Sequence, residues 1–292
     1  MKSGIAFIRK ELSGIFFKEE IESLIFLILE KMSGYSRTQF MLSKDEKLLG
    51  NEELIEIKNI VTRLKNHEPI QYILGQTEFY GLPFYSIPGV LIPRPETEEL
   101  VQWVIQENTL TAPILLDMGT GTGCIAISLR KNIEHSIVIA CDISPICIET
   151  AIRNAELNAV TVSVFEYDIL NNTPQVSFPM LDVIVSNPPY VRETEKLLMQ
   201  KNVLEYEPEL ALFVPDENPL IFYERIADFA LDHLKYEGRL YFEINEAFGQ
   251  GTIEMLQSKG FSNIVLKKDI NNKDRMIRSV VSNSKKSAHT LQ

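Results

Sequence analysis

The sequence predicts a doubly wound α/β fold preceded by a small helical bundle, and two observations lead to this fold class. From about residue 113 to residue 281, apolar runs of strand length alternate with segments of helical periodicity. This alternation is typical of a mainly parallel sheet covered by helices. Residues 1 to about 75 show helical spacing and no strand signal, and a chain of 292 residues has room for two domains.

The composition is that of a globular protein with a sizeable core, because 45% of the residues are hydrophobic and 24% are charged. The net charge of −11 argues mildly against binding to a nucleic-acid backbone, which requires clustered cations. Cys124, Cys141 and Cys147 form no CxxC pair, so we expect buried thiols in a reducing compartment. The four histidines are scattered, and no metal site is predicted.

Neither a signal peptide nor a membrane span is expected. The first residues carry too short an apolar run before their charges for a secretory signal. The most apolar segment, at 21–31, is interrupted by Glu22 and Glu30 and cannot cross a bilayer. We therefore expect a cytoplasmic protein.

The first 75 residues are expected to form a helical domain. A first helix is predicted at 19–31, where Ile21, Leu24 and Ile28 recur at helical spacing, and Gly34 is its stop signal. A second apolar stripe predicts a helix at 52–66. These stripes are expected to form the core of this domain.

Residues 76–95 are expected to form a hairpin or stiff connector, because glycines and prolines punctuate their aromatic and aliphatic residues. A helix should begin after Pro95, since Glu96, Glu98 and Glu99 occupy its first turn, where the helix dipole favours acidic groups.

Residues 96–283 are expected to form the α/β domain, with a seven-stranded and mostly parallel sheet. The polar tail at 284–292 should be frayed. Strands are predicted at 113–119, 136–142, 162–168, 180–187, 239–245, 262–269 and 275–281, and the helices after the first are predicted at 123–132, 144–158, 219–235 and 249–259.

A glycine loop lies between the first strand and the following helix of this domain. Glycines allow close approach of a ligand, and the helix N-terminus offers free N–H groups to an anion. The spacing of Gly121, Gly123 and Ala126 also satisfies the dinucleotide pattern G-x-G-x-x-A, although a structural glycine turn remains an alternative. The candidate cofactor-binding residues of the loop are Gly119, Thr120, Gly121, Thr122 and Gly123.

Two strand-ending carboxylates indicate which ligand the loop binds. Asp142 ends the second strand at the position where an acid accepts hydrogen bonds from ribose hydroxyls. Asp117, beside the loop, would repel a pyrophosphate and attract an ammonium group, unless it serves only as a strand-end cap. The pair therefore favours S-adenosyl-L-methionine over NAD. Asp168 would then reach the adenine amino group, with Ile169 beside the ring.

The segment Asn187–Tyr190, of sequence NPPY, follows a buried strand. The prolines stop the strand, so the segment is either a simple turn or a rigid pocket wall at the same sheet edge as the glycine loop. Asn187 Oδ1 and the Pro188 carbonyl oxygen could accept the two N–H groups of an amide, while Pro189 stiffens the loop and Tyr190 supplies a flat wall. Catalysis would then come from positioning, without a strong general base.

These motifs resemble a known family. The segments DMGTGTGCIAISL, CDIS and NPPY look like the signature of class I, Rossmann-like methyltransferases that act on planar nitrogens. The segments EPIQYILGQTEFYG, LIPRPETEELV, YEPELALF, EGRLYFEINEAFGQ and KDINNKDRMI are similar to those of the protein-(glutamine-N5) methyltransferases called PrmC or HemK. The likeness covers roughly residues 65 to 280.

The resemblance implies methylation of the glutamine in the Gly-Gly-Gln loop of class I peptide chain release factors, which the helical domain would help to dock. It also implies that Arg94, Pro95 and Thr97 help to enclose the pocket, although a connector and helix start explain the same residues. The chain departs from the family at Asn245 and Glu237, where glycine is common. We expect both departures to change local loops only, outside the methyl-transfer pocket.

Three other functions remain open. A glutamine methyltransferase that acts on a ribosomal protein would share the NPPY pocket. An amino-methyltransferase for adenine or guanine in nucleic acid would require a basic face, which the net charge does not support. A non-enzymatic binding module is disfavoured because the glycine loop and NPPY are both intact.

Overall fold

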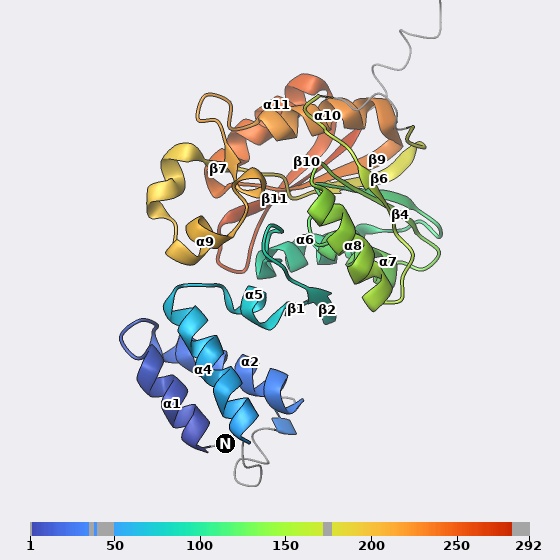
Figure 1. The fold of residues 1–292 in the computed structure, drawn as a ribbon. Helices are drawn as coiled ribbons and strands as arrows, with labels where there is room; N and C mark the ends of the chain where they lie inside the picture. The colour runs from blue at the N-terminus through green and yellow to red at the C-terminus, as the bar shows by residue number, and fades with distance from the viewer. Residues whose placement is uncertain (1, 35–37, 40–49, 172–176, 282–292) are drawn as a thin grey trace, which may run out of the picture. The chain divides into compact units, whose positions relative to one another are not determined.

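The computed structural model describes residues 2–34, 38–39, 50–171 and 177–281 (Figure 1). The chain forms two compact units, one of Met1–Gln76 with Gln200–Tyr206 and one of Thr77–Met199 with Glu207–Gln292. The polar tail expected at 284–292 lies outside the described residues.

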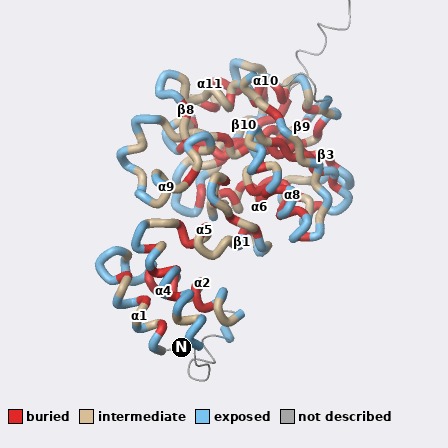
Figure 2. The backbone as a smooth tube through the Cα atoms, in the orientation of Figure 1, coloured by how far each residue is buried: buried red, intermediate tan, exposed pale blue. Residues whose placement is uncertain are grey.

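The first unit is helical. Its apolar helix faces form one buried cluster, which includes Ile8, Ile28 and Ile60 and appears red in Figure 2. The stop signal at Gly34 operates as expected, since this residue adopts a left-handed φ of 69° and its N–H bonds to the Glu30 carbonyl. The helices are α1 (Lys2–Leu12), α2 (Lys18–Ser33), α4 (Asn51–Lys65), α5 (Ile70–Leu74) and α9 (Lys201–Tyr206).

The segment Gln200–Tyr206, which includes α9, belongs to this first unit although it is distant in sequence. The Tyr206 hydroxyl donates a hydrogen bond of 2.8 Å to the Asn66 carbonyl oxygen. The contiguous domain ranges expected from the sequence did not include this segment, because no local pattern marks it.

The second unit contains a seven-stranded sheet of order β10-β11-β9-β6-β3-β4-β5. Strand β11 pairs antiparallel with β10 and with β9, and the other neighbouring pairs are parallel. The predicted fold class is therefore confirmed. The strands are β3 (Ile114–Met118), β4 (Ile137–Asp142), β5 (Ser163–Glu166), β6 (Leu181–Ser186), β9 (Leu234–Glu243), β10 (Phe261–Lys268) and β11 (Asp274–Val281).

Helices cover both faces of this sheet (Figure 1). Alternate strand residues point to opposite faces, so that Leu115 joins a cluster with α6 and α7, while Leu116 joins a cluster with α10 and α11. All three cysteines are free and buried. The helices of this unit are α6 (Pro95–Glu107), α7 (Cys124–Asn132), α8 (Pro145–Leu157), α10 (Ile221–His233) and α11 (Gly249–Lys259).

Short elements complete this unit. The expected hairpin is present as the two-stranded sheet β1–β2. Strand β9 begins five residues before the predicted 239–245, and Glu237 within it adopts φ 61°, a left-handed conformation that favours glycine. The short elements are β1 (Gln76–Phe79), β2 (Leu82–Tyr85), β7 (Val191–Arg192), η1 (Glu193–Leu198), η2 (Glu209–Ala211), β8 (Phe213–Val214) and η3 (Glu246–Phe248).

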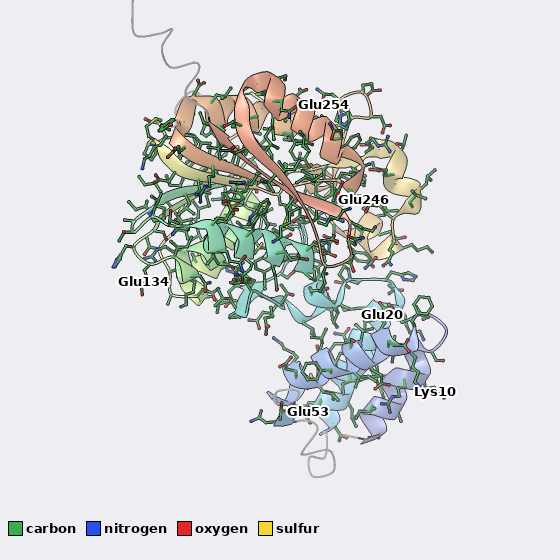
Figure 3. The ribbon with its side chains drawn as sticks, turned by 180° about the vertical axis from the view of Figure 1, so that it is seen from behind. Lys10, Glu20, Glu53, Glu134, Glu246 and Glu254 are labelled. Carbon is green, nitrogen blue, oxygen red and sulfur yellow. The ribbon has the colours of Figure 1, made fainter. Side chains whose placement is uncertain are left out.

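Many of the charged side chains lie on the outer surfaces of the two units. Lys10 and Glu20 are exposed in the first unit, and Glu134, Glu246 and Glu254 are exposed in the second (Figure 3). Within the described part of the chain, no helix is long and apolar enough to cross a membrane.

Candidate active site

The candidate site is a pocket of the second unit at the carboxyl ends of β3, β4, β5 and β6. Parallel strands bring these ends to one edge of the sheet, where α/β folds bind their ligands. Twelve of the residues expected from the sequence line this pocket: Arg94, Thr97, Gly119, Thr120, Gly121, Thr122, Asp142, Asp168, Ile169, Asn187, Pro188 and Pro189. Four others do not line it: Pro95, Asp117, Gly123 and Tyr190.

The glycine loop joins β3 to α7, and its glycines have two different tasks. Gly119 and Gly121 adopt φ of 76° and 56°, and a Cβ added to either would meet no atom within 4 Å. At Gly123 an added Cβ would lie only 3.1 Å from the Cβ of Ala151 in α8. The first two glycines therefore leave open space for a ligand, whereas Gly123 permits close packing of α7 against α8.

Asp142 ends β4 and connects this strand to the glycine loop. Its Oδ2 accepts a hydrogen bond of 2.9 Å from the Gly121 N–H, and its Oδ1 accepts one of 3.0 Å from the Ser144 N–H. Burial raises the pKa of Asp142, while the backbone N–H groups oppose this shift. The side chain is thus fixed at the pocket wall, with acceptor capacity left for hydroxyl donors.

Asp117 lies beneath the glycine loop, away from the pocket wall. Its Oδ2 accepts hydrogen bonds from the Thr120 hydroxyl at 2.6 Å and from the Ala126 N–H at 3.2 Å. Its Oδ1 is buried and has no partner among the described residues. Burial raises the pKa of Asp117 to about 7. The structure thus shows Asp117 shaping the loop from beneath it, with its unpaired Oδ1 buried and not on the pocket wall.

Asp168 and Ile169 lie on the pocket wall just after β5. Oδ1 of Asp168 accepts from the Leu170 N–H at 2.9 Å, and Oδ2 accepts from the Asn171 side-chain amide at 2.7 Å. Burial tends to raise the pKa of Asp168, but the hydrogen bonds from Asn171 and Leu170 leave it lowered. This carboxylate therefore remains charged and organises its own turn at the wall.

The NPPY segment begins directly after β6. Asn187 lines the pocket, and its Nδ2 donates a hydrogen bond of 3.2 Å to Thr97 Oγ1. Tyr190, expected as a flat wall, instead packs its ring against the core on the α10 and α11 face and donates its hydroxyl to Glu243 Oε1 at 3.1 Å. Burial raises the pKa of Tyr190 strongly, and the charge of Glu243 adds to the shift.

The IPRPETE segment lies against the same pocket. Arg94 Nη2 is 2.6 Å from Oε1 of the buried Glu207, whose Oε2 accepts a hydrogen bond of 3.2 Å from the Ile92 N–H. Pro95 occupies the first turn of α6 instead of the wall. The ion pair therefore connects the IPRPETE segment to the YEPEL segment at 206–210. The YEPEL segment also lines the pocket, through Pro208 and Leu210.

Other contacts were not expected from the sequence. The resemblance led us to place Asn245 outside the pocket, and Asn245 does not line it. However, its Nδ2 donates a hydrogen bond of 3.1 Å to the Tyr190 carbonyl oxygen. The residue that departs from the family pattern therefore contacts the last residue of NPPY. Apolar wall residues were also missed, because nothing local distinguishes them from the core: Cys147, Tyr167, Phe222 and Ile226.

The charges of the pocket suit a ligand without phosphate. Asp142 and Asp168 line it, and among its described residues only Arg94 carries a positive charge, which Glu207 neutralises. A pyrophosphate would find no unpaired cation there, whereas a ribose and an ammonium group would find acceptors. Among the described residues, no group of three or more His, Cys, Asp or Glu side chains could hold a metal ion.

Comparisons with solved structures agree with the fold. The catalytic domain of human Mettl16 in complex with an RNA hairpin superposes with a TM-score of 0.55 and 16% identity, covering 80% of this chain and 82% of that chain. A methyltransferase from Pyrococcus furiosus gives a TM-score of 0.52 and 19% identity, covering 76% and 98%. At these identities the likeness concerns the fold alone.

Comparisons with sequences are more specific. Residues 97–207 match the family model of the methyltransferase small domain, and residues 12–75 match that of the PrmC N-terminal domain. The release factor glutamine methyltransferase of Flavobacterium psychrophilum is 49% identical over 271 residues, covering 91% of this chain and 94% of that protein. Its counterpart from Bacteroides thetaiotaomicron is 46% identical over 272 residues, covering 93% and 97%. The chain therefore belongs to the family of release factor glutamine methyltransferases.

Proposed function

We propose that this chain transfers the methyl group of S-adenosyl-L-methionine to the side-chain amide nitrogen of the glutamine in the Gly-Gly-Gln motif of class I peptide chain release factors. The names of its relatives support this substrate. The observation that carries the chemistry is that the Asn187 carboxamide and the glycine loop line one pocket. A cytoplasmic location follows from the proposal, because release factors act on the ribosome.

The residues present fit the methyl donor. The carboxylate of Asp142 would accept hydrogen bonds from the ribose hydroxyls. Asp117 does not line the pocket and would act on the α-ammonium group through its charge from beneath the loop, without a direct hydrogen bond. The open space at Gly119 and Gly121 would allow the donor to approach the N-terminus of α7, which favours a carboxylate. Asp168 and Ile169 would contact the adenine.

The NPPY segment would bind the substrate amide. Asn187 Oδ1 and the Pro188 carbonyl oxygen would accept the two N–H groups of the glutamine side chain, because both residues line the pocket. Pro188 and Pro189 restrict the backbone at this point, so that the acceptors retain their direction. Tyr190 would support the segment from the core side, where its hydroxyl is bound to Glu243.

The protein would contribute to methyl transfer mainly by positioning the substrate amide nitrogen. When bound, the donor supplies a sulfonium-activated methyl group, and an amide nitrogen is a weak nucleophile. Two acceptors on its N–H groups orient the nitrogen and polarise the N–H bonds, which raises the electron density on the nitrogen. After the methyl group has been transferred, one N–H proton is lost to water. No strong base is required for this sequence of events.

A transfer assay tests the proposal directly. The enzyme is incubated with methyl-labelled S-adenosyl-L-methionine and, in parallel, with a release factor, the same release factor carrying Gln→Ala in its Gly-Gly-Gln loop, a mixture of ribosomal proteins, and DNA. We expect label in the intact release factor alone. Label in a ribosomal protein or in DNA, with none in the release factor, would replace the proposal with the corresponding rival function.

We propose further that the helical first unit binds the release factor. Its own buried cluster makes it an independent structural body, and its match to the PrmC N-terminal domain supports a role that is specific to this family.

A further inference from the structure

We propose that Glu243 is a positioning residue which, through Thr97, sets the orientation of the Asn187 carboxamide so that Oδ1 faces the pocket. The proposal rests on the proposed function, because it concerns how the substrate amide is received.

Glu243 is the last residue of β9 and is buried, with 1% of its surface exposed. Oε2 accepts a hydrogen bond of 2.6 Å from the Thr97 hydroxyl, and Oε1 accepts one of 3.1 Å from the Tyr190 hydroxyl. One carboxylate therefore bonds both α6, which borders the pocket, and the final residue of NPPY. Its backbone is also fixed, since its carbonyl oxygen accepts a hydrogen bond of 3.1 Å from the Tyr223 hydroxyl.

The direction of each proton follows from chemistry. An ionised carboxylate only accepts hydrogen bonds, and a threonine hydroxyl has a single proton. With Glu243 ionised, the Thr97 proton goes to Oε2 of Glu243, which leaves Thr97 Oγ1 as an acceptor. The group of Asn187 that lies 3.2 Å from this oxygen must then be the NH2 group.

This assignment fixes the other end of the carboxamide. Oδ1 and Nδ2 of Asn187 are bonded to the same carbon and point in different directions. When Nδ2 donates to Thr97, Oδ1 therefore points away from Thr97. Since the Asn187 side chain lines the pocket, we infer that Oδ1 faces the pocket. The reverse orientation would present NH2 to the substrate, and this group cannot accept the N–H of an amide. Through Thr97, Glu243 thus determines whether Asn187 presents its carbonyl oxygen or its NH2 group to the pocket.

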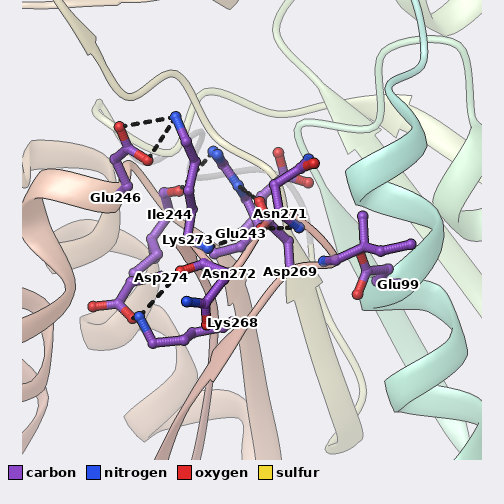
Figure 4. Close-up of polar contacts among 12 residues, drawn as sticks. Glu99, Glu243, Ile244, Glu246, Lys268, Asp269, Asn271, Asn272, Lys273 and Asp274 are labelled. Carbon is purple, nitrogen blue, oxygen red and sulfur yellow. Dashed lines mark hydrogen bonds and ion pairs between the residues drawn. The ribbon is translucent and has the colours of Figure 1, made fainter.

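Arg275 of β11 provides positive charge near Glu243. Figure 4 shows Glu243 near Asp269, in the turn between β10 and β11. Arg275 Nε pairs with Asp269 Oδ2 at 3.1 Å, and Arg275 Nη1 donates to the Ile244 carbonyl oxygen at 3.4 Å. Burial raises the pKa of Glu243 and the charge of Glu96 adds to the shift, while the hydrogen bonds of Thr97 and Tyr190 and the charge of Arg275 limit it. This cation is held by its own partners, so it stabilises the carboxylate without displacing Thr97.

The Glu243→Gln variant tests the inference, because glutamine has nearly the same shape and offers one acceptor and one donor. If its NH2 faces Thr97, the Thr97 proton turns to Asn187 and the carboxamide reverses. If its oxygen faces Thr97, its NH2 displaces the Tyr190 proton. We expect kcat for the release factor to fall about 10- to 100-fold, while the Kd of the donor from calorimetry changes less than about twofold.

Variants at Thr97 separate positioning from general stability. We call the two hydrogen bonds that connect Glu243 through Thr97 to Asn187 the relay. Thr97→Val removes the relay and should lower kcat as Glu243→Gln does. Thr97→Ser keeps the hydroxyl and should recover most of that loss. The double variant Glu243→Gln/Thr97→Val should lose no more than either single variant, because both break one relay. Thr252→Val removes another buried hydroxyl, that of Thr252 in α11, which donates to the Phe248 carbonyl oxygen, and should leave kcat unchanged.

A spectroscopic readout is independent of the proposed substrate. The side-chain amide resonance of Asn187, assigned by its absence in Asn187→Ala, should exchange slowly with solvent in the donor-free protein and in Thr97→Ser, and rapidly in Thr97→Val and Glu243→Gln. If the wild-type enzyme fails to label release factors, the proposed function is wrong and the resonance still tests the relay. A slowly exchanging amide in Thr97→Val, a lowered kcat in Glu243→Gln while its Asn187 amide still exchanges slowly, or kcat losses that add in the double variant would overturn the inference.

Discussion

At the scale of single residues, the two strand-ending carboxylates have different surroundings. Asp142 lines the pocket and is bonded to backbone N–H groups, whereas Asp117 is fully buried beneath the loop. The sequence places both at strand ends, but Asp117 lies opposite Ala140 and is followed within β3 by Met118, whereas Asp142 is the last residue of β4. Asp117 therefore bonds to Thr120 in the glycine loop and to Ala126 in α7 instead of reaching the pocket.

Asp142→Ala and Asn187→Ala should separate binding from catalysis. Removal of the Asp142 carboxylate should weaken donor affinity about 10-fold or more, since hydrogen bonds to charged groups contribute about 1.5 to 3 kcal/mol. Asn187→Ala should lower kcat at least about 100-fold with little change in the Kd of the donor. Calorimetry with the donor and steady-state kinetics check both, and the opposite pattern would refute the two assignments.

Asp117 should make stability depend on pH. Burial raises its pKa to about 7 from the ordinary value of 3.8, so the fold favours the neutral form. The stability that this carboxyl contributes is present below about pH 4 and is lost as the pH rises through 7. The free energy of unfolding of the wild type, measured without donor, should therefore fall by up to about 4 kcal/mol relative to Asp117→Asn between pH 4 and 7. A constant difference across this range would contradict the prediction.

At the scale of elements, the glycine loop combines a ligand site with a packing contact. Gly119 and Gly121 face open space, whereas Gly123 brings α7 within reach of α8. A single short motif therefore serves both the pocket and the layer of helices on one face of the sheet. Substitutions within it should differ in their effects.

Gly123→Ala should destabilise the protein by about 2 to 4 kcal/mol. The new Cβ would lie 3.1 Å from Ala151 Cβ and 3.2 Å from Ala151 Cα, and the φ of 81° is unfavourable for alanine. Gly260→Ala is the matched control, because its φ is 93° and an added Cβ would meet no atom within 4 Å. This control should lose only about 1 to 2 kcal/mol. Denaturant unfolding compares the two, and equal losses would show that the Ala151 contact is unimportant.

At the scale of the whole molecule, the two units have separate cores. The cluster of the first unit draws all its buried members from residues 8–70, while the two clusters of the second unit cover opposite faces of the sheet. Each unit therefore buries its own apolar surface, and loss of packing in one need not unfold the other.

Ile28→Ala tests both this independence and the docking role of the first unit. Ile28 is completely buried, so the variant should lose about 2 to 5 kcal/mol of stability. Hydrogen exchange should accelerate in α1, α2 and α4 while β3 and β6 stay protected. Methylation of the release factor should fall, but donor affinity should not.

Leu116→Ala is the matched variant of the second unit, where Leu116 is also completely buried. It should accelerate exchange in β3 and its neighbours and weaken donor binding, while α1, α2 and α4 stay protected. If Ile28→Ala left transfer to the release factor unchanged, the first unit would have no part in docking.

The sequence alone determined the α/β fold class, the chain order of the seven sheet strands and of the helices α6, α7, α8, α10 and α11, and the placement of the glycine loop, Asp142 and NPPY at one sheet edge, but it did not indicate α1, α5 or α9. These features were readable because periodicity, turn residues and strand-ending carboxylates are local signals, and parallel pairing brings such ends to one edge. The tertiary structure alone decided the surroundings of Glu243, Thr97 and Asn187, which lie on β9, on α6 and after β6. It also decided that Gln200–Tyr206 belongs to the first unit. These contacts join residues far apart in the chain, and no local pattern encodes which buried oxygen meets which hydroxyl.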